Sequence, residues 1–393
     1  MKIKNKTDAF NDPSIRVAFF RPSITKDDQR AVINALKKPL LTDGPILQEF
    51  EKKFSQFTNA KYAIGVSNAT SALQLSLKSL GIGKGDEVIL PDMTFIATAS
   101  SVLLNGAIPV LVDVEKDSMN ISINSIKKNI TKKTKAIIPV HFAGRVCDIL
   151  EIMKIARLHR LFVIEDCAHA IGARYKNKHV GLFGDAGCFS FYPTKNITTI
   201  EGGMIITKSK KIFEYVKLAR NHSIDKSLSQ RFSQGLPWNY DVKQAGYNYR
   251  LDEIRSSLGI NQLIRIEKLN LMRKKAYEYY NKKLKTIPGI ETPTSSDSQD
   301  NVYHLYIIKI CTNFGLSRNE LYKKLLELGI RTSVHYKPLH KFTLLKKQAK
   351  ISNNIENSKK LYDEILTLPF HPFISKYEQN YVIDSIRSLS AQS

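Results

Sequence analysis

The most informative part of the sequence is the stretch Cys188-Phe-Ser-Phe-Tyr-Pro-Thr-Lys-Asn-Ile-Thr-Thr-Ile-Glu-Gly-Gly203. The alternating apolar residues Phe189 and Phe191 predict a β-strand, which Pro193 ends because proline has no N–H to donate. Lys195 follows two residues later, and a lysine just past a buried strand is costly to hold without a partner or a task. Lys195 is therefore either a neutral amine that forms a Schiff base or a side chain that extends to solvent beside a turn.

Around this stretch the sequence alternates between short apolar runs and helical patterns. Runs that are apolar throughout predict the strands of a parallel sheet with helices on both faces, an α/β fold. Strands are expected at 62–66, 88–90, 109–112, 135–140 and 161–165, and helices at 70–80, 95–104 and 149–158. Because such sheets bind ligands beyond the carboxyl ends of their strands, the residues that follow each strand are the candidates for a site.

The residue patterns at the two ends of the chain differ from those of this central region. A polar arm runs to about Pro13, Ser23 is the expected cap of a helix ending near Lys38, and helical spacing continues over 46–57. One long helix is expected over 251–285, followed by a polar connector over 293–300. Beyond the connector we expect strands at 303–310 and 330–334, a helix at 319–328 and two terminal helices. The prediction is a large domain over 1–255, which includes the N-terminal arm, and a smaller C-terminal α+β domain over 256–393.

Candidate residues follow several of the predicted strands. The first strand leads into Gly65-Val-Ser-Asn-Ala-Thr-Ser-Ala72, whose small residues suit either a phosphate at a helix N-terminus or an ordinary helix cap. It is neither a Walker loop nor G-x-G-x-x-G, which counts against ATP and NAD. Asp166 ends another apolar run, and a carboxylate there needs a cationic partner. A protonated pyridine nitrogen is such a partner and makes the ring an electron sink.

The composition of the chain limits its other possible partners. Its 393 residues include 60 Lys and Arg against 36 Asp and Glu, a formal net charge of +24, which attracts anionic ligands, nucleic acid or anionic lipid. The basic residues are spread over many segments, so a compositional bias on solvated faces is favoured over a nucleic-acid surface.

The cysteines and the apolar runs indicate the compartment. The four cysteines show no C-x-x-C and no paired spacing, which is typical of reduced thiols rather than of a disulfide framework or a zinc site. The N-terminal residues lack the apolar stretch of a signal peptide, and no apolar run approaches the length of a membrane span. We therefore expect a cytoplasmic protein without a metal site, a membrane segment or a nucleic-acid partner.

Eight segments, from the start of the chain to its C-terminal part, form an ordered set of motifs. They are Leu41-Thr-Asp-Gly-Pro45, Ser67-Asn-Ala-Thr-Ser-Ala-Leu73, Pro91-Asp-Met-Thr-Phe-Ile-Ala-Thr98, Glu165-Asp-Cys-Ala-His169, Ser190-Phe-Tyr-Pro-Thr-Lys195, Glu201-Gly-Gly203, Gly246-Tyr-Asn-Tyr-Arg-Leu-Asp252 and Val334-His-Tyr-Lys-Pro-Leu339. Together they resemble the sugar aminotransferases of the DegT/DnrJ/EryC1/StrS family, which are pyridoxal 5'-phosphate (PLP) enzymes of fold type I, the aspartate aminotransferase fold.

The resemblance implies a role for each candidate residue. Lys195 forms the Schiff base with PLP and then transfers the proton, while Asp166 pairs with the pyridine nitrogen and His169 lies beside the ring hydroxyl. Phe95 stacks on the ring. The cofactor phosphate is bound by Ala69, Thr70 and Ser190.

Other matched positions imply partners. Asn248 reaches across a dimer to the cofactor phosphate, with Arg250 nearby, so the resemblance implies an obligate homodimer with shared active sites. His335 and Tyr336 match positions near the substrate, although either could be structural. The loop over 221–246, which holds the single tryptophan Trp238, lies where relatives vary with substrate.

The activity implied is transfer of an amino group from L-glutamate, which leaves as 2-oxoglutarate, to a nucleoside diphosphate keto sugar. The segment 334–339 favours C4 of a 4-keto-6-deoxy hexose, with C3 as the alternative. A non-catalytic protein that uses the fold for binding or regulation is a further alternative, which the intact pair of Lys195 and Asp166 disfavours. A nucleic-acid-binding protein is disfavoured by the dispersed lysines.

Overall fold

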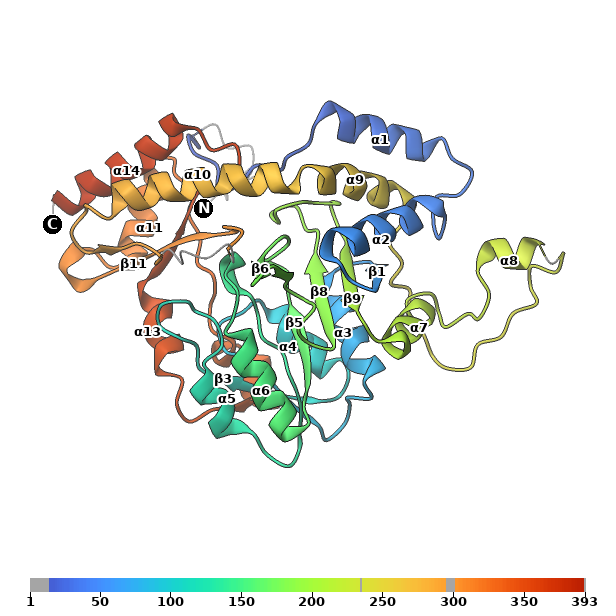
Figure 1. The fold of residues 1–393 in the computed structure, drawn as a ribbon. Helices are drawn as coiled ribbons and strands as arrows, with labels where there is room; N and C mark the ends of the chain where they lie inside the picture. Colours follow the sequence, from blue (N-terminus) through green and yellow to red (C-terminus); the bar gives the residue numbers. More distant parts are fainter. Residues whose placement is uncertain (1–13, 234, 295–300, 392–393) are drawn as a thin grey trace, which may run out of the picture.

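A computed structural model describes residues 14–233, 235–294 and 301–391 of the chain (Figure 1). Within these residues the larger sheet has eight strands in the order β1-β9-β8-β5-β4-β2-β3-β12. The strands are Tyr62–Val66 (β1), Glu87–Pro91 (β2), Ile108–Val112 (β3), Thr134–Ile137 (β4), Phe162–Asp166 (β5), Ala186–Ser190 (β8), Gly203–Thr207 (β9) and Lys350–Ile351 (β12). Only β9 runs antiparallel to its neighbours, so the predicted α/β fold with a mostly parallel sheet is confirmed.

The remaining elements surround this sheet and a smaller antiparallel one. The helices before β9 are Lys26–Leu36 (α1), Pro45–Thr58 (α2), Ala69–Ser79 (α3), Ile96–Leu103 (α4), Ile123–Asn129 (α5) and Ile149–His159 (α6). Those after it are Lys210–Ala219 (α7), Leu228–Ser233 (α8), Glu253–Ile264 (α9), Ile266–Leu284 (α10), Arg318–Glu327 (α11), Thr343–Gln348 (α12), Glu356–Glu364 (α13) and Lys376–Ala391 (α14). The smaller sheet joins Ile290–Glu291 (β10), Tyr306–Ile310 (β11) and Ile365–Leu368 (β13), and Arg174–Tyr175 (β6) pairs with Lys178–His179 (β7).

Successive residues of the central strands enter two different cores. Val88 and Leu90 of β2 pack in a core with helices α3, α4 and α7, whereas Ile89 between them packs in a second core with α5 and α6. Neighbouring side chains of a strand point to opposite faces, so a strand buried on both sides must be apolar throughout. This requirement explains why continuous apolar runs marked the sheet in the sequence.

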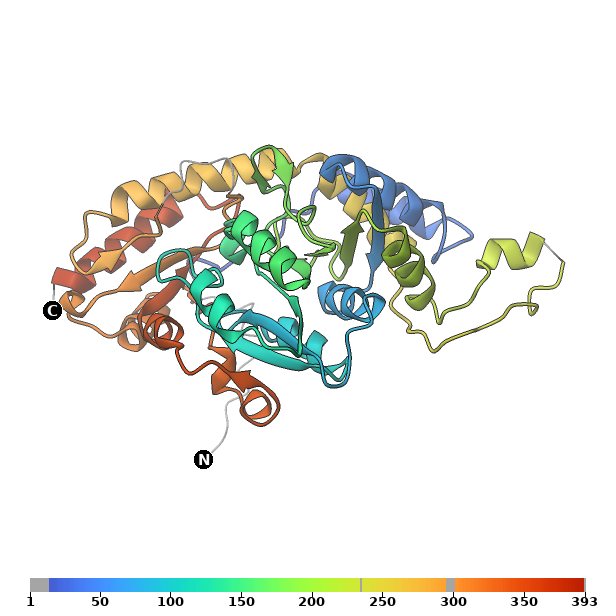
Figure 2. The same ribbon diagram turned by 60° about the horizontal axis from the view of Figure 1, so that its bottom comes forward.

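The C-terminal part of the chain has a core of its own. Tyr280, Tyr306 and Leu321 are among the residues that pack the smaller sheet against α10, α11 and α14. However, α9 packs against α1 and α2, and β12 extends the edge of the large sheet beside β3 (Figure 2). A domain boundary at residue 255 therefore stays a prediction.

Several predicted elements were placed wrongly. The long helix expected over 251–285 is broken at Arg265, whose guanidinium is bonded to Ser23 and Asp28. Thr25 rather than Ser23 caps α1, and the strand expected to reach residue 140 ends at Ile137, before Pro139. Over 330–334, where a strand was expected, Ile330 and Ser333 form isolated bridges instead. The predicted N-terminal arm and most of the predicted connector lie outside the described residues.

Glu253, the first residue of α9, fastens the start of α2 to the rest of the molecule. Its buried carboxylate accepts hydrogen bonds from the backbone N–H groups of Gly44, Ile46 and Leu47, at 3.1, 2.8 and 3.0 Å. The first N–H groups of a helix have no partner within the helix, and a carboxylate also complements the helix dipole there.

No helix in the described part of the chain is long and apolar enough to cross a membrane.

Replacing Glu253 with alanine should lower the free energy of unfolding by about 2–4 kcal/mol, because three N–H groups lose their acceptor and two of these hydrogen bonds are buried. Urea unfolding followed by circular dichroism measures this loss. The matched control is Glu267→Ala, which removes an exposed acid from the first turn of α10. Equal stabilities of the two variants would contradict the proposed contribution of Glu253.

Candidate active site

Asp166 lies at the carboxyl end of β5, next to the end of β8, where two parallel strands finish side by side. Its Oδ2 accepts a hydrogen bond from the Thr98 hydroxyl at 2.9 Å, and its Oδ1 accepts one from the Ala168 N–H at 3.1 Å. Burial raises the pKa of Asp166 above its ordinary value, while these hydrogen bonds and the positive charge of Lys195 oppose the rise. A buried carboxylate held in this way is suited to pair with a cation.

Lys195 follows β8 in a compact turn. The turn is closed by bonds from the N–H of Lys195 to the carbonyl of Tyr192 and from the N–H of Thr199 to the carbonyl of Phe191, both at 2.9 Å. Burial lowers the pKa of Lys195 from 10.5 to about 8, and the nearby Asp166 carboxylate opposes this shift. A substantial fraction of the amine is therefore neutral near physiological pH, as a nucleophile or a general base requires.

His169 lies close to the same carboxylate and amine. Its Nε2 is 3.1 Å from the hydroxyl of Tyr336, and its Nδ1 accepts a hydrogen bond from the Ala143 N–H at 3.4 Å. The ring of His304 lies 4.4 Å away, centroid to centroid. Burial, together with the charge of Lys195, lowers the pKa of His169 well below its ordinary value. The imidazole is therefore neutral. Because its Nδ1 accepts from Ala143, its Nε2 carries the proton and can donate to a phenol or another hydroxyl.

The start of α3 provides a cradle for an anion. Asn68 caps the helix through the Ser71 N–H at 2.8 Å, which leaves the N–H groups of Ala69 and Thr70 without partners within the helix. Gly203 allows β9 to approach this turn, since a Cβ at residue 203 would lie 2.5 Å from the carbonyl carbon of Asn68. Ser190 ends β8, next to β9.

The aromatic and histidine candidates form the outer part of the site. Phe95 precedes α4 with 57% of its surface exposed, and its ring centroid is 6.0 Å from that of Tyr336. His335 Nδ1 is 2.9 Å from the Thr367 hydroxyl, and its ring stacks on Phe19 at 5.7 Å. The structure thus joins Tyr336 directly to His169 and orients His335 through the smaller sheet.

Asn248 and Arg250 lie apart from this group. Asn248 forms an isolated bridge with Asn221, and Arg250 donates to the Asn221 side chain at 2.7 Å. The backbone carbonyl of the intervening Tyr249 accepts a hydrogen bond from the Ser67 N–H at 2.9 Å, which holds the loop beside the start of α3. Among the described residues no hydrogen bond connects Asn248 or Arg250 to Lys195, Asp166 or His169.

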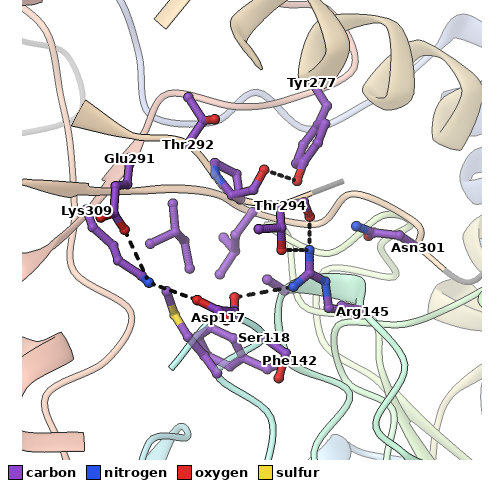
Figure 3. Close-up of a pocket in the computed structure, with 15 residues that line it drawn as sticks. Asp117, Ser118, Phe142, Arg145, Tyr277, Glu291, Thr292, Thr294, Asn301 and Lys309 are labelled. Atoms are coloured by element: carbon purple, nitrogen blue, oxygen red, sulfur yellow. Dashed lines mark hydrogen bonds and ion pairs between the residues drawn. The ribbon is translucent and has the colours of Figure 1, made fainter. Parts of the chain in front are cut away.

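A separate pocket lies between residues 117–119, residues 142–145 and the β10–β11 hairpin (Figure 3). Its charged side chains are already paired, because Lys309 lies 3.5 Å from Asp117 and 3.6 Å from Glu291. Arg145 donates to the carbonyl and hydroxyl oxygens of Thr294. None of the predicted site residues is among the described residues that line it, so the reactive groups identify the site around Lys195 instead.

Comparison with known proteins shows to which family the chain belongs. The family model described as the DegT/DnrJ/EryC1/StrS aminotransferase family matches residues 22–387. The chain belongs to this family. The spore coat polysaccharide biosynthesis protein SpsC of Bacillus subtilis is 36% identical over 371 residues, which cover 94% of this chain and 95% of SpsC.

Solved structures of other family members share the fold. The putative sugar aminotransferase Spr1654 from Streptococcus pneumoniae, in its PMP form, has a TM-score of 0.89 and 30% identity, with 96% of this chain and 99% of that chain covered. Helicobacter pylori PseC, an aminotransferase in the biosynthesis of pseudoaminic acid, has a TM-score of 0.88 and 30% identity, with 96% and 100% covered. The chain is a PLP-dependent sugar aminotransferase of fold type I.

The residues present fit this cofactor. The first N–H groups of α3, which have no partner within the helix, suit a phosphate, the buried Asp166 suits a pyridinium nitrogen, and Lys195 supplies an amine with a lowered pKa. Sequence reasoning missed Thr98, which is bonded to Asp166, and His304, which packs on His169. The hydroxyls of Thr94 and Thr98 come from residues four positions apart and lie 3.0 Å from each other, a spacing that could have pointed to Thr98.

The lowered pKa of Lys195 can be measured in protein freed of cofactor. The rate of amine acylation at Lys195, followed by mass spectrometry of its peptide, should reach half its maximum near pH 8, because only the neutral amine reacts. Asp166→Asn should move this midpoint to lower pH, since the carboxylate raises the pKa of the lysine. Asp363→Asn, which removes an exposed acid of α13, is the control and should leave the midpoint unchanged. A midpoint near 10.5 in the unaltered protein would exclude this effect of burial.

Proposed function

We propose that this sugar aminotransferase moves an amino group from L-glutamate to a nucleoside diphosphate keto sugar, at C4 of a 4-keto-6-deoxy hexose. The observation that carries the proposal is the juxtaposition of Lys195 and Asp166 beside the anion cradle of α3. The relatives named for spore coat polysaccharide and pseudoaminic acid biosynthesis support a product destined for a cell-surface glycan. The high net charge favours an anionic nucleotide substrate.

In this proposal each residue near the strand ends has one task. PLP, when bound, supplies an electron sink that stabilises negative charge at the carbon that loses a proton. Neutral Lys195 accepts and returns that proton at Nζ, and Asp166 keeps the ring nitrogen protonated. His169, oriented by Tyr336 and by the Ala143 N–H that donates to its Nδ1, carries its proton on Nε2 and would donate it in a hydrogen bond to the ring hydroxyl.

The phosphate and the outer face of the cofactor need other groups. The N–H groups of Ala69 and Thr70 and the hydroxyls of Thr70 and Ser190 bind the phosphate. The exposed ring of Phe95 would hold the pyridine ring by stacking and would exclude water from it. His335 lies on the substrate side, next to Tyr336.

We also propose that the active protein is a homodimer whose subunits complete each other's sites. Much of the segment formed by residues 221–233 and 235–246, including α8, projects from the body of the molecule in two views (Figures 1 and 2). Large apolar side chains of this projecting segment are exposed, namely Phe232, Leu236, Trp238, Tyr240 and Val242. Burial of these side chains against a second copy removes apolar surface from water, and Asn248 follows the segment directly.

The alternatives are less well supported. Amino transfer at C3 would use the same residues around Lys195, so the choice of C4 rests on the segment 334–339. A non-catalytic binding protein would not need both a lysine with a lowered pKa and a buried Asp166.

Addition of L-glutamate to the PLP-loaded protein should bleach its visible absorbance band and release 2-oxoglutarate. Lys195→Ala should fold and bind PLP but lose at least 1000-fold in turnover, because no other amine occupies that position. Lys208→Ala, an exposed lysine beyond β9, is the control. Turnover of Lys195→Ala at the rate of the unaltered protein would refute the mechanism, and a yellow protein indifferent to glutamate would refute the proposed donor.

The position of transfer can be decided with the bleached protein. Nucleoside diphosphate 4-keto-6-deoxy hexoses should restore the visible band, because they accept the amino group, whereas matched 3-keto sugars should not. Both UDP-linked and dTDP-linked compounds belong in the test. Restoration by the 3-keto sugars alone would replace the proposed C4 specificity with C3.

Shared sites predict complementation between two inactive variants. If Asn248 acts in the partner's site, a hybrid of Lys195→Ala and Asn248→Ala subunits contains one site with both residues intact. Random mixing should then recover about a quarter of the activity, because half the dimers are hybrids and each has one working site. Absence of recovery, with hybrids present by native mass spectrometry, would place Asn248 in the site of its own chain.

A further inference from the structure

A small cavity lies beside the segment that carries Lys195. It is enclosed by residues 20–23, by residues 193–198, by α9 and α10 and by residues 371–372. The space admits roughly one sphere the size of a water molecule. The residues that line it are Phe20, Arg21, Pro22, Ser23, Pro193, Thr194, Lys195, Asn196, Thr198, Gln262, Arg273, His371 and Pro372.

Arg273 brings a positive charge to this cavity. The residue is only 4% exposed, its Nη1 donates to the carbonyl of His304 at 3.2 Å, and its guanidinium lies 5.7 Å from the ring centroid of Phe370. Its Nε is buried and has no hydrogen-bond partner in the described part of the chain. Burial lowers the pKa of Arg273 to about 9, because removal from water disfavours its positive charge.

His371 presents further unused hydrogen-bonding groups. It is 1% exposed, and neither ring nitrogen has a partner among the described residues. Burial lowers the pKa of His371 to about 4, so the neutral ring still offers one N–H donor. The nearby Glu378 cannot serve as the counter-charge, because it pairs with Arg21 at 2.8 Å and accepts from the Ser375 N–H at 2.8 Å.

No residue among the described lining of the cavity is Asp or Glu. A water molecule could complete the hydrogen bonds of Arg273 and His371, but it would leave the buried guanidinium without a counter-charge. A monatomic anion supplies both the charge and the acceptor. The small size of the space favours a monatomic anion over phosphate or sulfate, which are larger.

We propose that this cavity binds a small monovalent anion of the size of chloride, held by the Arg273 guanidinium and an N–H of His371. The anion connects α10, the segment around Lys195 and the segment after β13, which are brought together only in the folded chain. It therefore stabilises the native state, and this role is independent of the proposed sugar substrate and amino donor.

Thermal unfolding of the PLP-loaded protein tests this role. Chloride should raise the melting temperature relative to gluconate at equal ionic strength. Above the dissociation constant, each tenfold increase in chloride should raise the folding equilibrium constant up to tenfold, because the anion binds only the native state. Equal melting temperatures in the two salts would overturn the proposal.

Two variants and a control show whether the chloride dependence of the melting temperature arises in this cavity. Arg273→Gln and His371→Phe should each abolish the chloride dependence, whereas Arg387→Gln, which removes a surface arginine paired with Asp384, should retain it. Retention of the dependence in both cavity variants would assign it to another part of the molecule and overturn the proposal.

Crystals grown in bromide provide a direct measurement that does not require the variants to fold. Anomalous scattering should show one bromide between Arg273 and His371. Density without an anomalous signal at this position identifies water as the occupant and overturns the proposal.

Discussion

The arrangement of the site depends on one buried carboxylate. Asp166 ends β5 in the middle of the large sheet, where desolvation opposes its charge and the Thr98 hydroxyl, the Ala168 N–H and Lys195 support it. The cost of burying this charge is offset when a cation occupies the space before it. Because β5 and β8 run parallel and adjacent, the turn after β8 brings the Lys195 amine to the same edge. Removal of this amine from water lowers the pKa of Lys195, just as it disfavours the charge of Asp166.

Two other constraints hold the surroundings of this pair. The carboxylate of Glu253 replaces the missing acceptors at the start of α2, which ties residues more than 200 positions apart. Gly203 lets β9 lie against the backbone of Asn68, so the cradle of α3 is fixed at the edge of the sheet. The second of these contacts joins two backbone segments directly. The start of α3 is thus positioned by backbone packing rather than by the flexible ends of long side chains.

The sheet was predictable because its signals are local. A strand buried on both faces is apolar throughout, and the carboxyl end of each parallel strand marks one edge of the sheet. Two features that the sequence did not predict depend on contacts with distant residues. Arg265 interrupts the long helix where its guanidinium meets Ser23 and Asp28, and β12 joins the large sheet from the far end of the chain. No periodicity in either segment encodes these contacts.

For the site, the sequence by itself determined which residue types follow the strands: a lysine after β8, an aspartate at the end of β5 and small residues before α3. It did so because the chemistry of a side chain and its place along a strand are properties of neighbouring residues. Only the tertiary structure decided which distant groups orient them. The bond between Tyr336 and His169 joins residues 167 positions apart, and the support of Asp166 by Thr98 spans 68. Such pairs are fixed by how the layers pack, since a hydrogen bond forms only when two groups meet within about 3 Å.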